Sequence, residues 1–150
     1  MRKVISNTSC LIALSNIGRL DVLRGLYETI SITPEVAGEF GEALPEWISI
    51  VPVTDPSKTK LIQQTLDLGE SSTIALAIET ADSLLILDDG KARRFAKNMG
   101  LAMTGTLGVI AKSSQTGLMI SMPKPHKTVY AIRAIGKGIS KKSSMTKINA

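Results

Sequence analysis

The stretch that decides the fold is LDLGESSTIALAIETADSLLILDD, which runs from Leu66 to Asp89. Its IALAI segment at 74–78 is apolar on every side of a helix, which predicts a central, buried helix over 73–80 with 70–72 as its cap. The LLIL segment at 84–87 is an uninterrupted apolar run, as expected for a strand that is covered on both faces. The run ends at Asp88-Asp89, so this strand leads directly into two adjacent carboxylates.

The rest of the chain alternates strand-like and helix-like segments in the same way. We predict strands over 4–6, 30–32, 47–51, 84–87 and 101–103, and helices over 8–15, 20–26, 34–40, 58–68, 73–80, 91–98, 106–116 and 125–135. The first of these helices has Asn7 or Thr8 as its expected cap. Because no hairpin signals separate the strands, the pattern indicates an α/β sandwich around a mostly parallel sheet.

Composition and charge indicate one globular domain with a basic end. The 150 residues are 43% hydrophobic, and the formal net charge is +5. From Lys124 onward the chain has seven Lys or Arg residues and no Asp or Glu, which favours polyanions, although a solvated helix and tail would have the same composition. We predict a domain over 1–135 and a basic, flexible tail over 136–150. With no membrane-spanning run and no visible signal peptide, a cytoplasmic location is the default expectation.

Polar side chains follow several of the predicted strands, at the end where parallel sheets bind ligands. The first strand is followed by Asn7-Thr8-Ser9, the second by Glu35 and Glu39, the fourth by Asp88-Asp89 and the fifth by Thr104-Gly105-Thr106, while Glu70 opens the buried helix. Each of these residues alone could be a helix cap or a first-turn acid. Two carboxylates beside the core, however, cost free energy unless a cation is near.

The residue types available as metal ligands, and the catalytic motifs that are absent, limit which metals and mechanisms are possible. The chain has one His, His126, and one Cys, Cys10, which we expect to be a buried structural thiol. Zinc sites of the usual nitrogen and sulfur type are therefore excluded, whereas carboxylate, amide and hydroxyl oxygens suit Mg²⁺ or Mn²⁺. No G-x-S-x-G, P-loop or G-x-G-x-x-G motif is present, and a phosphoacceptor domain of the response-regulator type would need its Asp pair after the first strand.

Four segments together resemble the PIN-domain nucleases, in particular a small prokaryotic DUF3368-type branch similar to toxins of toxin–antitoxin pairs. The segments are VISNTSCLIALSNIGRLDVL (4–23), ITPEVAGEF (32–40), LDLGESSTIALAIETADSLLILDD (66–89) and GLAMTGTLGVIAKSSQTGL (100–118). The resemblance implies a three-layer α/β/α sandwich around a parallel five-stranded sheet in which the first and fourth strands are neighbours. It also implies Mg²⁺- or Mn²⁺-dependent cleavage of RNA phosphodiester bonds, homodimers and silencing by an antitoxin protein.

Carried over position by position, the resemblance implies a set of site residues. The catalytic positions fall on Asn7, Glu39, Glu70, Asp88 and Asp89, of which Asn7, Glu70, Asp88 and Asp89 would bind metal. Around the pocket, Thr8, Ser9, Thr104 and Thr106 match polar positions, and Lys91, Arg93 and Arg94 would position the RNA backbone. Carboxylates of this kind hold ions that polarise the phosphate and activate a water.

Asn7 stands where the family has its first acid. Its amide oxygen can still bind a hard cation, but it lacks the charge of a carboxylate. Three interpretations are open: a weakened nuclease, a degenerate module that binds nucleic acid or a partner protein without cleaving, or a position changed deliberately to disarm a toxic nuclease.

Overall fold

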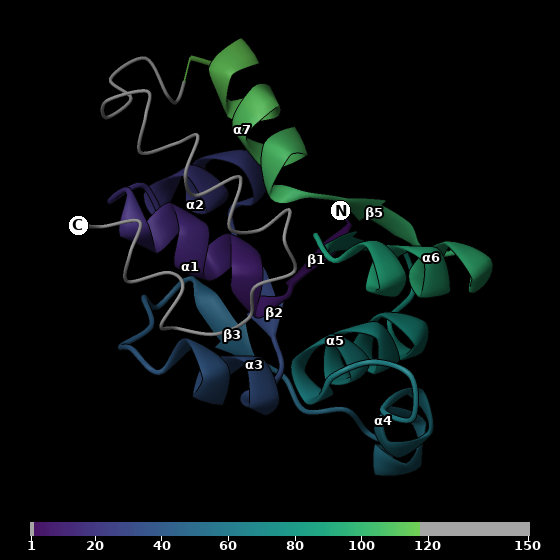
Figure 1. Ribbon diagram of the computed structural model, residues 1–150. Helices are drawn as coiled ribbons and strands as arrows, with labels where there is room; N and C mark the ends of the chain where they lie inside the picture. Colours follow the sequence, from purple (N-terminus) through teal and green to yellow (C-terminus); the bar gives the residue numbers. More distant parts are fainter. Residues whose placement is uncertain (1, 118–150) are drawn as a thin grey trace.

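The computed structural model describes residues 2–117, which form a five-stranded, all-parallel sheet with helices on both faces (Figure 1). The strands are β1 (Lys3–Ser6), β2 (Ile30–Ile32), β3 (Ile48–Ile50), β4 (Ser83–Ile86) and β5 (Ala102–Thr104). The helices are α1 (Thr8–Asn16), α2 (Asp21–Tyr27), α3 (Pro34–Phe40), α4 (Pro56–Ile62), α5 (Leu68–Glu79), α6 (Gly90–Asn98) and α7 (Thr106–Gln115). The helix predicted over 125–135 and the basic tail over 136–150 lie outside the described residues.

Alternate side chains of the central strands enter two separate cores. Val4 and Ile86 pack with α1, α2, α3 and α7, whereas Ile5 and Leu85 pack with α4, α5 and α6. Figure 1 shows α1, α2 and α7 on one side of the sheet and α4, α5 and α6 on the other. The prediction that the strand after Ser83 is covered on both faces is therefore confirmed, and so is the three-layer α/β/α fold.

The central helix α5 begins earlier than predicted. Its residues 71–77 are all buried, as the apolar run indicated, but the helix starts at Leu68 rather than at residue 73. The reason is its cap: Asp67 accepts a hydrogen bond from the backbone N–H of Glu70 at 2.8 Å. The predicted helix over 58–68 is also wrong in its bounds, because α4 starts at Pro56, behind the capping Asp55, and ends at Ile62.

The strand order β3-β2-β1-β4-β5 reverses direction between β1 and β4. These two strands pair in parallel from Lys3 opposite Ser83 to Ser6 opposite Ile86, so the expectation that the first and fourth strands are neighbours is confirmed. In open parallel sheets, ligands bind beyond the carboxyl ends of the strands at such a reversal. Asn7 and Asp88 both follow these strands, at this edge of the sheet.

Among residues 2–117, no helix combines the length and the apolar character needed to cross a membrane.

Candidate active site at the carboxyl ends of β1 and β4

Asn7 occupies the N-cap position of α1 but does not cap the helix with its side chain. Its backbone N–H donates to the carbonyl of Ile86 on β4 at 3.0 Å, which fixes the residue at the point where the sheet reverses. The residue is only 5% exposed, and its Oδ1 is buried without a hydrogen-bond partner. The predicted capping role is therefore wrong for this side chain. A buried acceptor without a donor is rare in proteins and is a natural place for a cation.

Asp88 is held by the first residue of α7. Its Oδ1 accepts from the backbone N–H of Thr106 at 2.8 Å, and its Oδ2 accepts from the Thr106 hydroxyl at 2.6 Å. Burial raises the pKa of the Asp88 carboxyl above its usual value, although the Thr106 hydrogen bonds and the charge of Arg93 act in the opposite direction. At Gly105, a Cβ would lie 2.9 Å from Asp88 Oδ1, so the absence of a side chain there lets the β5–α7 turn approach the carboxylate.

Two further side chains surround Asp88. Arg93 reaches back from α6 and donates from Nη1 to the carbonyl of Leu87 at 2.7 Å. Cys10 of α1 is fully buried, and burial and the Asp88 charge raise the pKa of its thiol to about 12. The thiol therefore stays protonated at neutral pH, which agrees with the expectation of a structural cysteine.

Glu39 joins three helices at the same edge. Its Oε1 accepts from the Thr8 hydroxyl of α1 at 2.5 Å, and its carboxylate lies against Gly69 in the first turn of α5, where a Cβ would overlap with it. The residue as a whole is exposed, yet partial desolvation of the carboxylate raises the pKa of Glu39, opposed by the Thr8 hydrogen bond and reinforced by the negative charge of Asp67. Thr8 and Glu39, predicted as separate site residues, are thus direct partners.

Glu70 lies in a strongly negative environment. Burial, followed by the charges of Asp67 and Asp89, raises the pKa of Glu70 to about 8. Asp67 and Asp89 each use one carboxylate oxygen to cap a helix, since Asp89 Oδ2 accepts from the backbone N–H of Ala92 at 2.9 Å. The capping interpretation is therefore correct for Asp89, and its second oxygen has no hydrogen bond among residues 2–117.

The raised pKa of Glu70 predicts an unusual pH dependence of stability. Between pH 4.5 and 8 the folded protein keeps a proton on Glu70 that the unfolded chain has released, so raising the pH through this window favours unfolding. Because the side chain is partly exposed and solvent screens it, we expect a loss of about 1–2 kcal/mol rather than the full shift. Urea unfolding of the wild type and of Glu70→Gln in EDTA should show this loss only in the wild type. Parallel pH profiles for the two proteins would contradict it.

The donor set at this edge fits a hard divalent cation. No three or more His, Cys, Asp or Glu side chains in the described part of the chain lie close enough to hold a metal ion together. Mg²⁺, however, usually keeps several waters and binds through one or two carboxylates together with substrate phosphates. Asn7 Oδ1 supplies a buried oxygen without a partner, and Glu70 supplies a carboxylate whose negative charge its neighbours disfavour. A cation beside Asn7 Oδ1 would give that atom a partner, and a cation beside Glu70 would offset the negative charge of its neighbours.

The other predicted site residues divide into two groups. Lys91 and Arg94 are exposed on α6, immediately beyond the Asp pair. Ser9 is half-buried in the first turn of α1, and the Thr104 hydroxyl lies against Gly108 of α7.

Asp67, Gly69 and Gly105 were not predicted as site residues. Asp67 precedes Glu70 by three residues, a capping spacing that could have identified it. Nothing in the sequence alone indicated that the two glycines lie against carboxylates.

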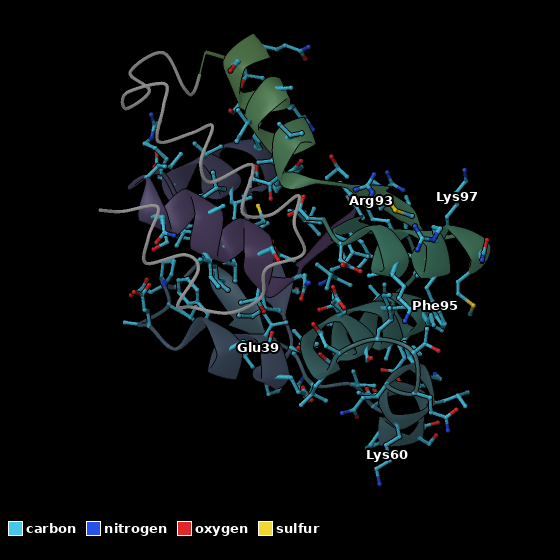
Figure 2. The ribbon with its side chains drawn as sticks, in the orientation of Figure 1. Glu39, Lys60, Arg93, Phe95 and Lys97 are labelled. Carbon is cyan, nitrogen blue, oxygen red and sulfur yellow. The ribbon has the colours of Figure 1, made fainter. Side chains whose placement is uncertain are left out.

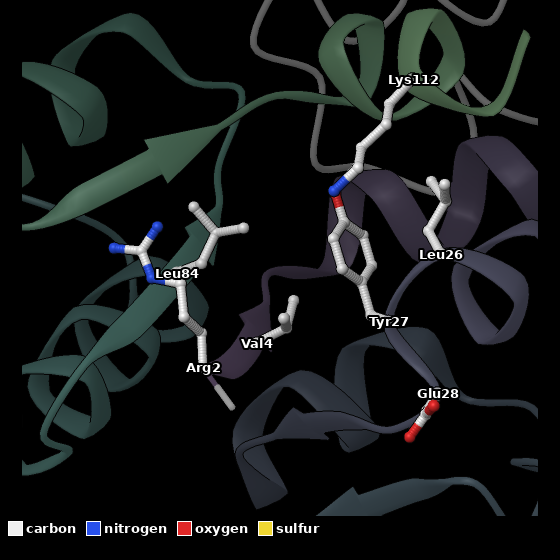
Figure 3. A pocket seen from close by; sticks show the side chains of 7 residues that line it. All are labelled: Arg2, Val4, Leu26, Tyr27, Glu28, Leu84 and Lys112. Carbon is white, nitrogen blue, oxygen red and sulfur yellow. The ribbon is translucent and has the colours of Figure 1, made fainter. Parts of the chain in front are cut away.

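A pocket of about 300 Å³ lies away from the acids, toward the amino ends of β1 and β4. It is lined by Arg2, Val4, Leu26, Tyr27, Glu28, Leu84 and Lys112. Figure 3 shows Lys112 of α7 reaching toward Tyr27 of α2, and its Nζ lies 4.9 Å from the ring centroid. With Glu28 as its single carboxylate, this pocket does not share the chemistry of the β1–β4 edge.

A protein-family model, the DUF3368 PIN domain, matches residues 3–143. The chain belongs to this PIN-domain family. PIN domains are a nuclease-like, nucleic-acid-binding family and generally use divalent metal ions, which agrees with the oxygen-only donor set of the β1–β4 edge. A search of curated proteins found no significant match.

Proposed function

We propose that this PIN domain is a Mg²⁺- or Mn²⁺-dependent ribonuclease whose activity is weakened by Asn7. The observation that supports the proposal is the uncompensated set of oxygens at the strand-order reversal. The buried Oδ1 of Asn7 has no partner, and the carboxylate of Glu70 has negative neighbours. A phosphodiesterase that uses a divalent ion needs such oxygens at the carboxyl ends of the strands.

Each side chain has a definite task in this proposal. The ligands proposed are Asn7, Glu70, Asp88 and Asp89, of which Asn7 and at most two of the carboxylates would hold one ion at a time, with water completing its coordination. The ion would polarise the phosphate and lower the pKa of the attacking water. Thr106 orients Asp88 through its two hydrogen bonds. Thr8 orients Glu39, which closes the edge beside the head of α5. The hydroxyls of Ser9 and Thr104 flank the substrate.

The test is cleavage of a labelled single-stranded RNA by the purified full chain. We expect cleavage with Mn²⁺ or Mg²⁺ and at least a tenfold lower rate in EDTA, because the ion supplies most of the charge stabilisation. Cleavage that persists at the same rate in EDTA would reject a metal-dependent mechanism.

A second candidate function is a non-catalytic module that binds nucleic acid or a partner protein. It is favoured by the neutral Asn7 and by the finding that residues 2–117 bring no three His, Cys, Asp or Glu side chains together. RNA binding without cleavage in either metal, with an affinity that EDTA does not change, would support this function over the nuclease.

The biological setting is proposed on the resemblance alone. In it the protein is a cytoplasmic toxin, forms a homodimer and is inhibited by an antitoxin protein. From the composition we further propose that the domain ends at residue 135, before a basic tail.

A further inference from the structure

Helix α6 carries three exposed cationic side chains that form no salt bridge among residues 2–117. Its sequence GKARRFAKN has four cationic side chains and no acidic one. Lys91, Arg94 and Lys97 are exposed, and Figure 2 shows Lys97 pointing away from the protein near one end of the helix. The salt bridges found among residues 2–117 lie elsewhere, at the pairs Arg2–Asp82, Arg19–Asp21 and Lys58–Glu79.

This arrangement costs the isolated protein free energy. Lys91 and Arg94, and again Arg94 and Lys97, are three residues apart, where like charges destabilise a helix by about 0.2–0.5 kcal/mol per pair. Lys91 also lies in the first turn, where the positive end of the helix dipole disfavours a cation. A bound polyanion would remove both costs.

The exposed side chains of α6 fit a phosphate backbone better than a protein surface. Ala92 and Ala96 are buried, and Phe95 packs against the core under the helix, so the outer face from Gly90 to Asn98 presents no apolar anchor. Protein interfaces normally centre on aromatic or other apolar side chains, whereas Lys and Arg side chains contact phosphates without needing an apolar anchor.

Arg93 does not belong to this surface. Its Nη1 donates to the carbonyl of Leu87 at 2.7 Å, and its charge acts on Asp88. The resemblance grouped Arg93 with Lys91 and Arg94, but Arg93 is half-buried and bonded to Leu87, whereas the other two are exposed.

We propose that Lys91, Arg94 and Lys97 contact successive phosphates of an RNA strand that leaves the acidic edge along α6. One part of this proposal rests on the proposed nuclease function, namely that the RNA is cut at the acidic edge from which the strand leaves. Because α6 starts directly after its N-cap residue Asp89, the row of three cationic side chains begins next to the acidic residues that follow β4. Lys91 and Lys97 are separated by about 9 Å along the helix axis, which spans roughly two or three phosphates. Such contacts read no bases, so this part of the interface binds any sequence.

The test measures binding without cleavage. Fluorescence anisotropy of a labelled single-stranded RNA oligonucleotide is recorded in EDTA over a series of KCl concentrations, with the full chain. For the Lys91→Gln/Arg94→Gln/Lys97→Gln variant we expect the slope of log K against log salt to fall by about 2, since each lost phosphate contact contributes about 0.7. The basic residues after Lys124 are the same in every protein and cancel in the comparison.

Lys60→Gln provides a control that removes one positive charge from a helix other than α6. Lys60 is an exposed lysine on α4, well away from α6 in Figure 2, and its loss should leave the slope within the error of the wild type. The triple variant should also unfold at the same or a slightly higher urea concentration, because it removes like-charge repulsion.

An unchanged slope in the triple variant overturns the proposal. So does a triple variant that keeps RNA binding but loses binding to polyglutamate, which would identify an acidic protein as the partner. A reduced slope in a protein that cleaves nothing with Mg²⁺ or Mn²⁺ supports the proposal and rejects the nuclease. If the protein cleaves RNA but the triple variant leaves the salt slope unchanged, the nuclease function is supported and the proposal about α6 is rejected.

Discussion

Asn7→Asp is expected to increase Mg²⁺ affinity and RNA cleavage by about tenfold or more, because a charged ligand replaces a neutral one at a buried position. In EDTA the same variant should be less stable than the wild type by about 2–4 kcal/mol, since it buries a second carboxylate near Asp88 without a partner. Adding Mn²⁺ should restore the stability that the variant loses in EDTA. Calorimetric metal titration, cleavage of a labelled RNA and urea unfolding with and without metal measure the three effects.

Gln115→Glu is the matched control for this substitution. It also turns an amide into a carboxylate, but Gln115 is exposed at the last residue of α7, about 13.5 Å along that helix from Thr106. It should change neither metal affinity nor metal-dependent stability. Equal metal affinity and equal cleavage for wild type and Asn7→Asp would mean that Asn7 does not contact the ion.

The layers of the fold could be predicted because the sequence pattern reports burial directly. A strand that is apolar at every position has to be covered on both faces, and Leu85 and Ile86 do enter opposite cores. The start of α5 could not be predicted from the apolar run at 74–78, because helix ends depend on capping. Asp67 bonds to the N–H of Glu70 and adds a polar first turn that the apolar pattern does not contain.

The candidate site was less predictable than the fold. The sequence places Asn7 and Asp88 after strands, but only the strand order makes those strands neighbours. It also cannot tell that Asn7 Oδ1 lacks a donor or that Glu39 bonds to Thr8, because both depend on how α1 and α3 pack. The two cations Arg93 and Arg94 are adjacent in sequence, yet one bonds to Leu87 and the other faces solvent. The local sequence pattern determines which helices and strands form, whereas the packing of those helices and strands determines which side chains contact one another.

Asp88→Asn is expected to reduce metal-dependent cleavage by about 100-fold while leaving the folded protein nearly as stable as before. Activity falls because the substitution removes the negative charge at the strand end beside Asn7, which is already neutral. Stability changes little, within about 1 kcal/mol, because two effects oppose each other. The amide oxygen can still accept from the Thr106 hydroxyl but leaves the backbone N–H of Thr106 less well paired. In return, the substitution removes a charge that burial disfavours, as the raised pKa of Asp88 indicates.

Asp82→Asn separates this effect from a general loss of charge. Asp82 is exposed near the amino end of β4, pairs with Arg2 at 3.1 Å and has a φ of 53°, a conformation that Asn adopts readily. It should keep full cleavage and full stability. Cleavage rates and urea unfolding midpoints of both variants decide the matter, because a role limited to folding would lower activity only in proportion to the unfolded fraction. An Asp88→Asn protein that is folded and cleaves RNA at the wild-type rate would exclude Asp88 from the metal site, and would leave Glu70 and Asp89 as the charged ligands proposed.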